Sequence, residues 1–209
     1  MVGMVTTHIS VSLDGFVAGV NDSPDNPLGD RGDMLHQWVY QLESWRKQHH
    51  LQGGDRNLDS KIIEEQAKRT GAVVMGHRMF QHGEKFWGEH PPFHVPVFVV
   101  THYFRESERK EGGTSYHFVT DGLQTAIEKA RIEAGTLDVA IAGGADVIQQ
   151  AIKEKLLDEC QLHIAPVFLG DGVRLFEGID EFESNWKPVD VKASPTVTHI
   201  TYQIRREES

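Results

Sequence analysis

Residues 139–147 read VAIAGGADV, an apolar run that ends in two glycines and continues directly into a helix-forming segment. Because Gly143 and Gly144 carry no side chains, backbone N–H groups at this turn can approach an anion closely. The dipole of the helix that follows adds a partial positive charge. The turn therefore predicts a binding site for a pyrophosphate, although two glycines at a tight strand-to-helix turn can also serve the fold alone.

Short β-rich apolar runs alternate with helical segments around this turn. The runs lie at 72–75, 95–100, 116–119 and 139–142, and helices are predicted over 121–134 and from Gly144 onward. Such alternation is typical of a buried parallel sheet with helices on both faces. The run 5–13 is also strand-like, and 160–164 and 200–204 show the period of antiparallel strands. We therefore expect one α/β domain over residues 1–209, with a mixed, mostly parallel sheet of about eight strands.

The region before residue 72 combines polar loops with helical patterns. Residues 19–33 and 48–57 are rich in turn formers and predict long surface loops, which often border ligands. Between the loops, an amphipathic helix with Asp33 as its N-cap is predicted from four apolar residues at helical spacing: Leu35, Trp38, Leu42 and Trp45. A second helix is predicted from Asp59 to a stop at Gly71, with Ile62, Ile63 and Ala67 facing the core.

The composition limits the classes of molecule that the protein can bind. The 209 residues carry a formal net charge of −10, so nonspecific binding to nucleic acid or anionic lipid has no electrostatic basis, and an anionic ligand needs a local basic cluster. No apolar run reaches the roughly 18 residues of a membrane span. The single cysteine, Cys160, excludes an internal disulfide. With no secretory signal visible at the start of the sequence, we expect a cytoplasmic location.

Basic residues follow two further strands. Gly76 ends the run 72–75 and is followed by His77, Arg78 and Met79. In an acidic chain, a basic pair at a strand's carboxyl end suits an anionic cofactor group, although a solvated arginine explains the pattern equally well. Thr101 and His102 close the strand 95–100 in the same way, with Arg105 close behind. Three strand ends are thus expected to face one crevice.

Asp14 ends the first strand and precedes Gly15. A carboxylate at this place could hold a substrate N–H group or assist proton transfer, and Asp14 is therefore the candidate catalytic residue. The alternative is an aspartate that serves only the turn of an Asp-Gly pair.

Five strings together resemble one family: SLDGFVAG at 12–19, GHRMF at 76–80, PPFHVPVF at 91–98, AGGA at 142–145 and LDECQLHIAPVFLGDG at 157–172. In this order and spacing they resemble the dihydrofolate-reductase-like proteins related to the reductase domain of riboflavin biosynthesis. The resemblance extends from about residue 4 to residue 205. It implies a dihydrofolate-reductase-like three-layer α/β/α fold, an NADPH-dependent oxidoreductase acting on a small pterin- or aminopyrimidine-like heterocycle, and a homodimer.

The resemblance also assigns residues to parts of NADPH. It implies that the pyrophosphate turn is formed by Gly143, Gly144, Ala145, Asp146 and Val147. Gly76, His77, Arg78 and Met79 resemble the segment that grips phosphates, and Thr101 and His102 resemble the site of the adenosine 2′-phosphate. Val17 and Ala18 resemble the loop that passes the nicotinamide.

The sequence departs from the family mainly at the substrate. His77 stands where an arginine is usual, so recognition of the 2′-phosphate falls to Arg78 or Arg105. Phe16 replaces the lysine of riboflavin-pathway reductases. Asp33 is a loose candidate for the acid that dihydrofolate reductases carry on their first helix. The substrate is therefore left open between these classes.

Other functions were weighed against a reductase. The twelve histidines show no metal-binding spacing, and the GxSxG turn of serine hydrolases is absent. A noncatalytic nucleotide-binding module of the same fold and a flavin-binding protein stay open as alternatives. The aromatic stretch 83–93 predicts either a lid over the substrate pocket or a packed surface loop, and the run 162–169 either a subunit interface or core.

Overall fold

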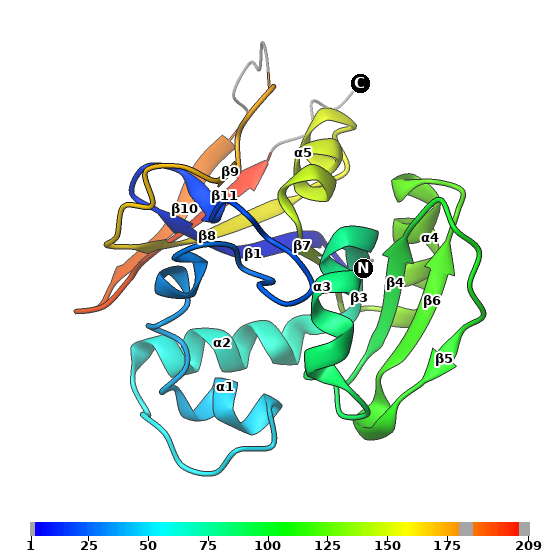
Figure 1. Ribbon diagram of the computed structural model, residues 1–209, viewed down its shortest axis with the longest axis horizontal. Coiled ribbons are helices and arrows are strands. Elements are labelled where there is room, and N and C mark those ends of the chain that lie inside the picture. Colours follow the sequence, from blue (N-terminus) through cyan, green and yellow to red (C-terminus); the bar gives the residue numbers. More distant parts are fainter. Residues whose placement is uncertain (1–2, 180–185, 205–209) are drawn as a thin grey trace.

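One large sheet forms the middle layer of the protein in the computed structural model, which describes residues 3–179 and 186–204 (Figure 1). Among these residues the sheet has nine strands in the order β10-β11-β8-β1-β7-β3-β4-β6-β5. Their bounds are β1 Val5–Ser12, β3 Thr70–Gly76, β4 Pro96–Val100, β5 Glu108–Arg109, β6 Ser115–Val119, β7 Asp138–Gly143, β8 Glu159–Ala165, β10 Trp186–Ala193 and β11 Thr198–Ile204. The six strands from β8 to β6 are parallel, and β5, β10 and β11 pair antiparallel.

Helices cover both faces of the sheet, as the alternation of apolar runs predicted. They are α1 Glu43–Gln48, α2 Leu58–Arg69, α3 His77–Trp87, α4 Leu123–Ala134 and α5 Ala145–Lys153, with short 3-10 helices at Gly32–Leu35 and Glu111–Gly113. Side chains of β3 divide the core: Ala72 and Val74 pack in the cluster of α4 and α5, and Val73 and Met75 pack in that of α3. In Figure 1, α3 passes in front of the sheet and α4 lies behind it. The expected three-layer fold is confirmed.

The amphipathic helix predicted from Asp33 to Trp45 is wrong. A 3-10 helix starts after Arg31, turns follow, and a six-residue α1 starts only at Glu43. Tertiary burial selects this path, because Trp38 packs in a cluster with Val197 and donates from its indole N–H to Ser10 Oγ at 3.1 Å. The apolar spacing that suggested a helix thus marks separate core contacts.

The second helix was located correctly, and Ile62 is buried as predicted, with Ile63 packed against a core cluster. Asn57 caps α2, since its side chain accepts a hydrogen bond from the backbone N–H of Ser60 at 2.9 Å. Ala67 is exposed rather than inward-facing, and the helix buries Asp59 instead. The buried face of α2 is partly polar because the strands beneath it are also polar.

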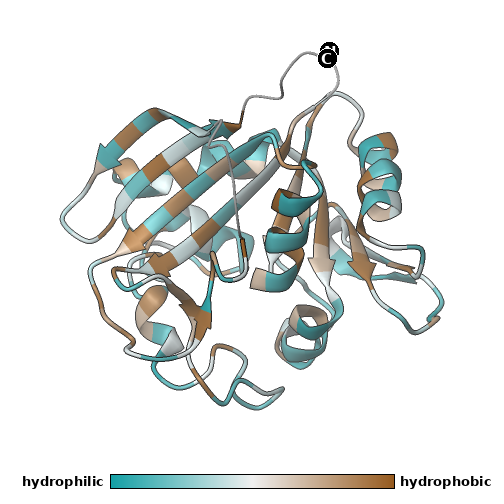
Figure 2. Cartoon of the chain, turned by 90° about the horizontal axis from the view of Figure 1, so that it is seen from above, coloured by the Kyte–Doolittle hydropathy of each residue, from teal (hydrophilic) through white to brown (hydrophobic). Residues whose placement is uncertain are grey.

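The C-terminal strands differ in part from expectation. Strand β8 runs parallel to β1, and only β11 and β10 add antiparallel strands beyond it. Brown and teal residues alternate along these strands (Figure 2), which is the pattern of strands with one buried face. A separate two-stranded ribbon pairs β2 Phe16–Ala18 with β9 Val173–Arg174. Of the helices described, none is long and apolar enough to cross a membrane.

Candidate active site

A cavity of about 540 Å³ opens where the parallel strands β3, β4 and β7 end. Every residue that the sequence assigned to cofactor binding lines it: Val17, Ala18, Gly76, His77, Arg78, Met79, Thr101, His102, Gly143, Gly144, Ala145, Asp146 and Val147. The three strand ends thus face one crevice. That these residues hold a nucleotide stays a prediction.

The glycine turn between β7 and α5 leaves open space. Gly143 has a φ of 130°, which only glycine adopts readily, and Gly144 is the N-cap of α5. A Cβ atom built on Gly144 would meet no other atom within 4 Å. No side chain therefore plugs the turn, and the free N–H groups at the start of the nine-residue α5 lie beside the cavity.

The segment after β3 lies directly beside this turn. A Cβ atom on Gly143 would stand 3.4 Å from the sulfur of Met79, and one on Gly76 would come within 2.8 Å of Val147. Helix α3 starts at His77, whose buried Nδ1 has no hydrogen-bond partner among the described residues. An unpartnered imidazole nitrogen on a cavity wall is a position where a ligand can supply the missing hydrogen bond.

Arg78 is the cationic side chain at this crevice, and it is already paired. Its guanidinium forms an ion pair with Asp22, whose other carboxylate oxygen lies 3.4 Å from Nδ1 of His82. Arg105, the alternative for a 2′-phosphate, does not line the cavity. Its guanidinium packs over the ring of Phe118 and pairs with Glu84 and Glu108, each at 2.5 Å. Of the two arginines considered, only Arg78 can reach a ligand in the cavity.

Thr101 and His102 complete the third strand end. Thr101 is buried, and its hydroxyl accepts the backbone N–H of Tyr103 at 3.0 Å. The ring of Tyr103 is exposed and lies 5.6 Å from that of His77. The ends of β3 and β4 thereby form one continuous wall.

The structure places Asp14 outside the cavity lining and favours its alternative role as a turn residue. Its carboxylate accepts backbone N–H groups from Leu169 at 3.2 Å and Gly170 at 2.7 Å. Hydrogen bonds, chiefly from Ser12, lower the pKa of Asp14. A carboxylate that is kept charged and already bonded is a poor proton donor, so this geometry does not favour the predicted catalytic role, which stays a prediction.

Sequence reasoning missed the wall opposite the strand ends. It is formed by residues 22–36 and the second half of α3, through Asp22, Pro27, Leu28, His36, His82, Phe86 and Trp87. Burial lowers the pKa of His36 to about 4, so this imidazole is neutral at pH 7. Two signals were available: the expectation that loop 19–33 borders a ligand site, and the alternative that the aromatic stretch 83–93, which contains Phe86 and Trp87, covers the substrate pocket.

The stretch 83–93 is not a separate lid. Helix α3 continues through Trp87, whose ring packs against Phe93 with centroids 4.9 Å apart. Phe86 and Trp87 do line the cavity, as part of the helix. Among the residues described, no group of three histidine, cysteine, aspartate or glutamate side chains is placed to hold a metal ion.

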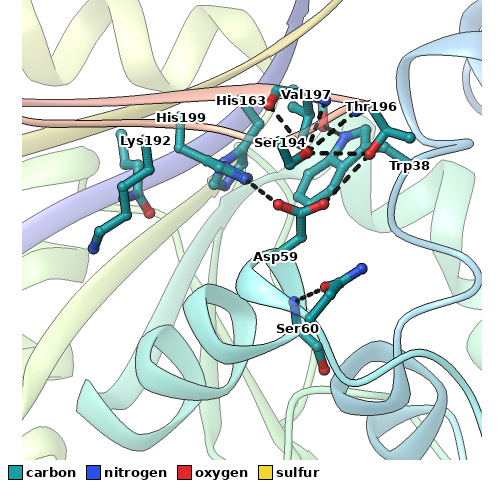
Figure 3. A network of polar contacts seen from close by, with 12 residues as sticks. Trp38, Asp59, Ser60, His163, Lys192, Ser194, Thr196, Val197 and His199 are labelled. Carbon is teal, nitrogen blue, oxygen red and sulfur yellow. Dashed lines mark hydrogen bonds and ion pairs between the residues drawn. The ribbon is translucent and has the colours of Figure 1, made fainter.

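A second polar cluster is buried between α2 and the strands β8 and β11 (Figure 3). His163 and His199 approach at 2.7 Å through their Nδ1 atoms, and Nε2 of His199 lies 3.1 Å from Asp59. Since the Asp59 carboxylate can only accept there, His199 donates through Nε2 and accepts from His163 through Nδ1. Burial lowers the pKa of His163 well below its usual value. None of the three lines the cavity, so the cluster fastens α2 to the sheet.

Comparisons with known proteins bear on this cavity and fold. The family model of the RibD C-terminal domain matches residues 4–200. The chain belongs to the RibD C-terminal domain family. The chain is 25% identical over 169 residues to the uncharacterized protein YwjB of Bacillus subtilis, with 81% of this chain and 80% of YwjB covered.

Several solved structures share the fold of this chain. A protein assigned to riboflavin biosynthesis from Shewanella sp. PV-4 has a TM-score of 0.69 and 22% identity, with 97% of this chain and 99% of that chain covered. A diaminohydroxyphosphoribosylaminopyrimidine deaminase/5-amino-6-(5-phosphoribosylamino)uracil reductase of Thermotoga maritima has a TM-score of 0.61 and 13% identity, with 98% of this chain and 57% of that chain covered. Dihydrofolate reductase of Enterococcus faecalis, solved with NADP(H), gives 0.54 and 14%, with 98% of both chains covered. These likenesses establish the dihydrofolate-reductase-like fold.

Proposed function

We propose that this protein is an NADPH-dependent reductase of a small planar heterocycle of the pterin or aminopyrimidine kind. The family match supports a reductase of the riboflavin and dihydrofolate type, and hence an oxidoreductase. A dihydrofolate reductase of the same fold was solved with NADP(H), which supports a nicotinamide cofactor.

The observation that carries the proposal is the convergence of three strand ends and an open glycine turn on one cavity. The residues present fit a dinucleotide. The vacant position over Gly144 admits a phosphate next to free helix N–H groups, and the unpartnered Nδ1 of His77 offers a further polar contact.

Each part of the wall has a role in this proposal. Backbone N–H groups of Ala145 and Asp146 hold the pyrophosphate, and Arg78 with His77 holds a second phosphate. Thr101 and His102 line the adenosine side. Val17 and Ala18, fixed by the pairing of β2 with β9, orient the nicotinamide toward the wall formed by residues 22–36. The bound dinucleotide supplies a hydride to the substrate.

Two measurements test the proposal. Titration with NADPH, followed by quenching of the fluorescence of the four tryptophans, one of which lines the cavity, should saturate, with NADH weaker because it lacks the 2′-phosphate. Oxidation of NADPH, followed by absorbance, should then depend on a pterin or aminopyrimidine acceptor. Lack of NADPH binding contradicts the cofactor site. Binding without turnover of any acceptor favours the noncatalytic nucleotide-binding module, and a yellow purified protein favours a bound flavin.

Three further properties follow from the same assignment as proposals. The chain forms a single reductase domain over residues 1–209, acts as a homodimer, and works in the cytoplasm. Size-exclusion chromatography with light scattering tests the dimer. In the run 162–169, Leu162 and Leu169 are buried in the core, whereas Pro166 and Phe168 are exposed, so these two are its candidates for contact with a second subunit.

A further inference from the structure

We infer that the substrate is an uncharged, planar, amino-bearing heterocycle without a phosphate or carboxylate group. This inference rests on the proposed function and concerns the part of the cavity that the dinucleotide leaves free. We call this part the substrate wall, and it consists of Asp22, Leu28, His36, His82 and Phe86.

The first step is the charge on the cavity lining. Of the described residues that line the cavity, Arg78 alone is an arginine or lysine, whereas Asp22 and Asp146 are acidic. Arg78 already pairs with Asp22, and in the proposed function it also meets a cofactor phosphate. No uncommitted guanidinium or ammonium group is therefore left on this lining for an anionic substituent of the substrate.

The histidines of the substrate wall do not change this balance. His36 is neutral at pH 7 because burial lowers its pKa to about 4. His82 lies with its Nδ1 atom 3.4 Å from Asp22, and both side chains are only 13% exposed. His82 thus faces the same carboxylate that pairs with Arg78, so its Nδ1 edge is already engaged within the protein. His77 and His102 lie at the strand ends assigned to the dinucleotide.

The basic groups nearest to Phe16 are also committed elsewhere. Phe16 is 3% exposed, and the guanidinium of Arg174 stacks over its ring at 4.3 Å. The same guanidinium donates to the backbone oxygen of Asp14 at 3.0 Å. Arg174 does not line the cavity, so it does not replace a substrate-binding lysine at this strand end.

What the substrate wall does offer is apolar surface with polar edges. Leu28 and Phe86 provide apolar surface against which a flat ring can pack, and Ile9 adds to it from elsewhere in the cavity lining. Carboxylate oxygens of Asp22 and the neutral imidazole of His36 can receive N–H groups at the edge of such a ring. A phosphate placed there would lie beside the Asp22 carboxylate in a partly buried site, where repulsion is strong.

A matched pair of ligands tests the inference directly. The probes are 5-amino-6-ribosylaminouracil and its 5′-phosphate, which differ only in the phosphate. Binding is measured by isothermal titration calorimetry, with and without saturating NADP⁺. We expect the compound without phosphate to bind at least tenfold more tightly. Equal or tighter binding of the phosphate overturns the inference, as does failure of the neutral compound to bind.

Variants of loop 19–33 assign the discrimination to one carboxylate. Asp22→Asn removes the charge and frees Arg78, so it should reduce the ratio of the two affinities at least fivefold by strengthening binding of the phosphate. Asp25→Asn is the control. Asp25 lies on the same loop as Asp22 and pairs with Lys85 of α3 at 2.8 Å, but it does not line the cavity. An unchanged ratio in Asp22→Asn, in a variant with an unaltered melting temperature, would assign no role to Asp22. A separate NADPH titration reports on the proposed function, so the two can fail independently.

Discussion

A negative charge placed at the glycine turn should show whether this turn binds a phosphate or serves only the fold. Gly144 has φ −74° and ψ −168°, which any L-residue can adopt, and a Cβ atom there meets no other atom within 4 Å. Gly144→Asp is therefore expected to fold. Its carboxylate would lie within a few ångströms of the bound pyrophosphate, at the partly solvated mouth of the cavity.

The size of the effect follows from Coulomb's law. Two unit charges about 4 Å apart repel by about 1 kcal/mol in water and about 4 kcal/mol at the effective dielectric constant of a protein surface. We therefore expect Gly144→Asp to weaken NADPH binding by at least about 1.4 kcal/mol, which is tenfold.

The assay is tryptophan fluorescence titration with NADPH, and Gly144→Asn is the matched control. Asparagine has nearly the same shape as aspartate but no charge, so any loss shared by both variants reports on space and not on electrostatics. If Gly144→Asp and Gly144→Asn bind NADPH with the same affinity, and their melting temperatures equal that of the parent, no phosphate lies at this turn.

Three other perturbations have expected outcomes. Burial lowers the pKa of His8 and of His36 to about 4, so as the pH falls the unfolded chain, with ordinary histidines, binds protons before the folded protein does. The free energy of unfolding should therefore drop by a few kcal/mol between about pH 6.5 and pH 4. A free energy of unfolding that does not change with pH in urea titrations would refute this. Asp59→Ala should lower the free energy of unfolding by about 1–3 kcal/mol, because it leaves Nε2 of His199 buried without its acceptor. It should leave NADPH affinity unchanged. A lower NADPH affinity in a fully folded variant would show that this cluster affects the cavity. Asp14→Asn should lower the melting temperature but not kcat, since the carboxylate bonds Leu169 and Gly170, whereas a large loss of kcat alone would restore its catalytic assignment.

The part of the site that the sequence predicted is the part built by local chemistry. Gly76, Thr101 and Gly143 each end a short apolar strand, and in a parallel sheet such ends meet at one edge. Periodicity and strand order alone are then enough to bring distant residues together. The glycine turn needed no tertiary information, because its conformation and its closeness to an anion both depend on the absence of side chains.

The substrate wall could not be predicted in this way because it depends on tertiary contacts of a loop. Residues 19–33 have no regular hydrophobic period, and their path is set by side-chain pairs such as Asn21 with Asp30 and Asp22 with Arg78. The misplaced helix before α1 has the same origin, since Trp38 is positioned by Ser10 and by the histidines of the sheet. Asp14 shows the same dependence: its Asp-Gly motif is local, but its carboxylate accepts hydrogen bonds from Leu169 and Gly170, which are far away in the sequence.

One wall of the cavity is thus determined by local sequence and the other by tertiary contacts, and this difference bears on substrate specificity. The wall formed by the three strand ends, which we call the dinucleotide wall because it binds the dinucleotide in the proposed function, uses backbone N–H groups and glycines. Many side-chain changes elsewhere would leave these groups intact. The substrate wall uses side chains of one loop and one helix, joined by the carboxylate of Asp22 between Arg78 and His82. A single charge change at Asp22 alters the substrate wall and frees the cation of the dinucleotide wall at once. If the proposed function holds, substrate preference in this protein can shift through one loop residue while the backbone of the three strand ends stays as it is.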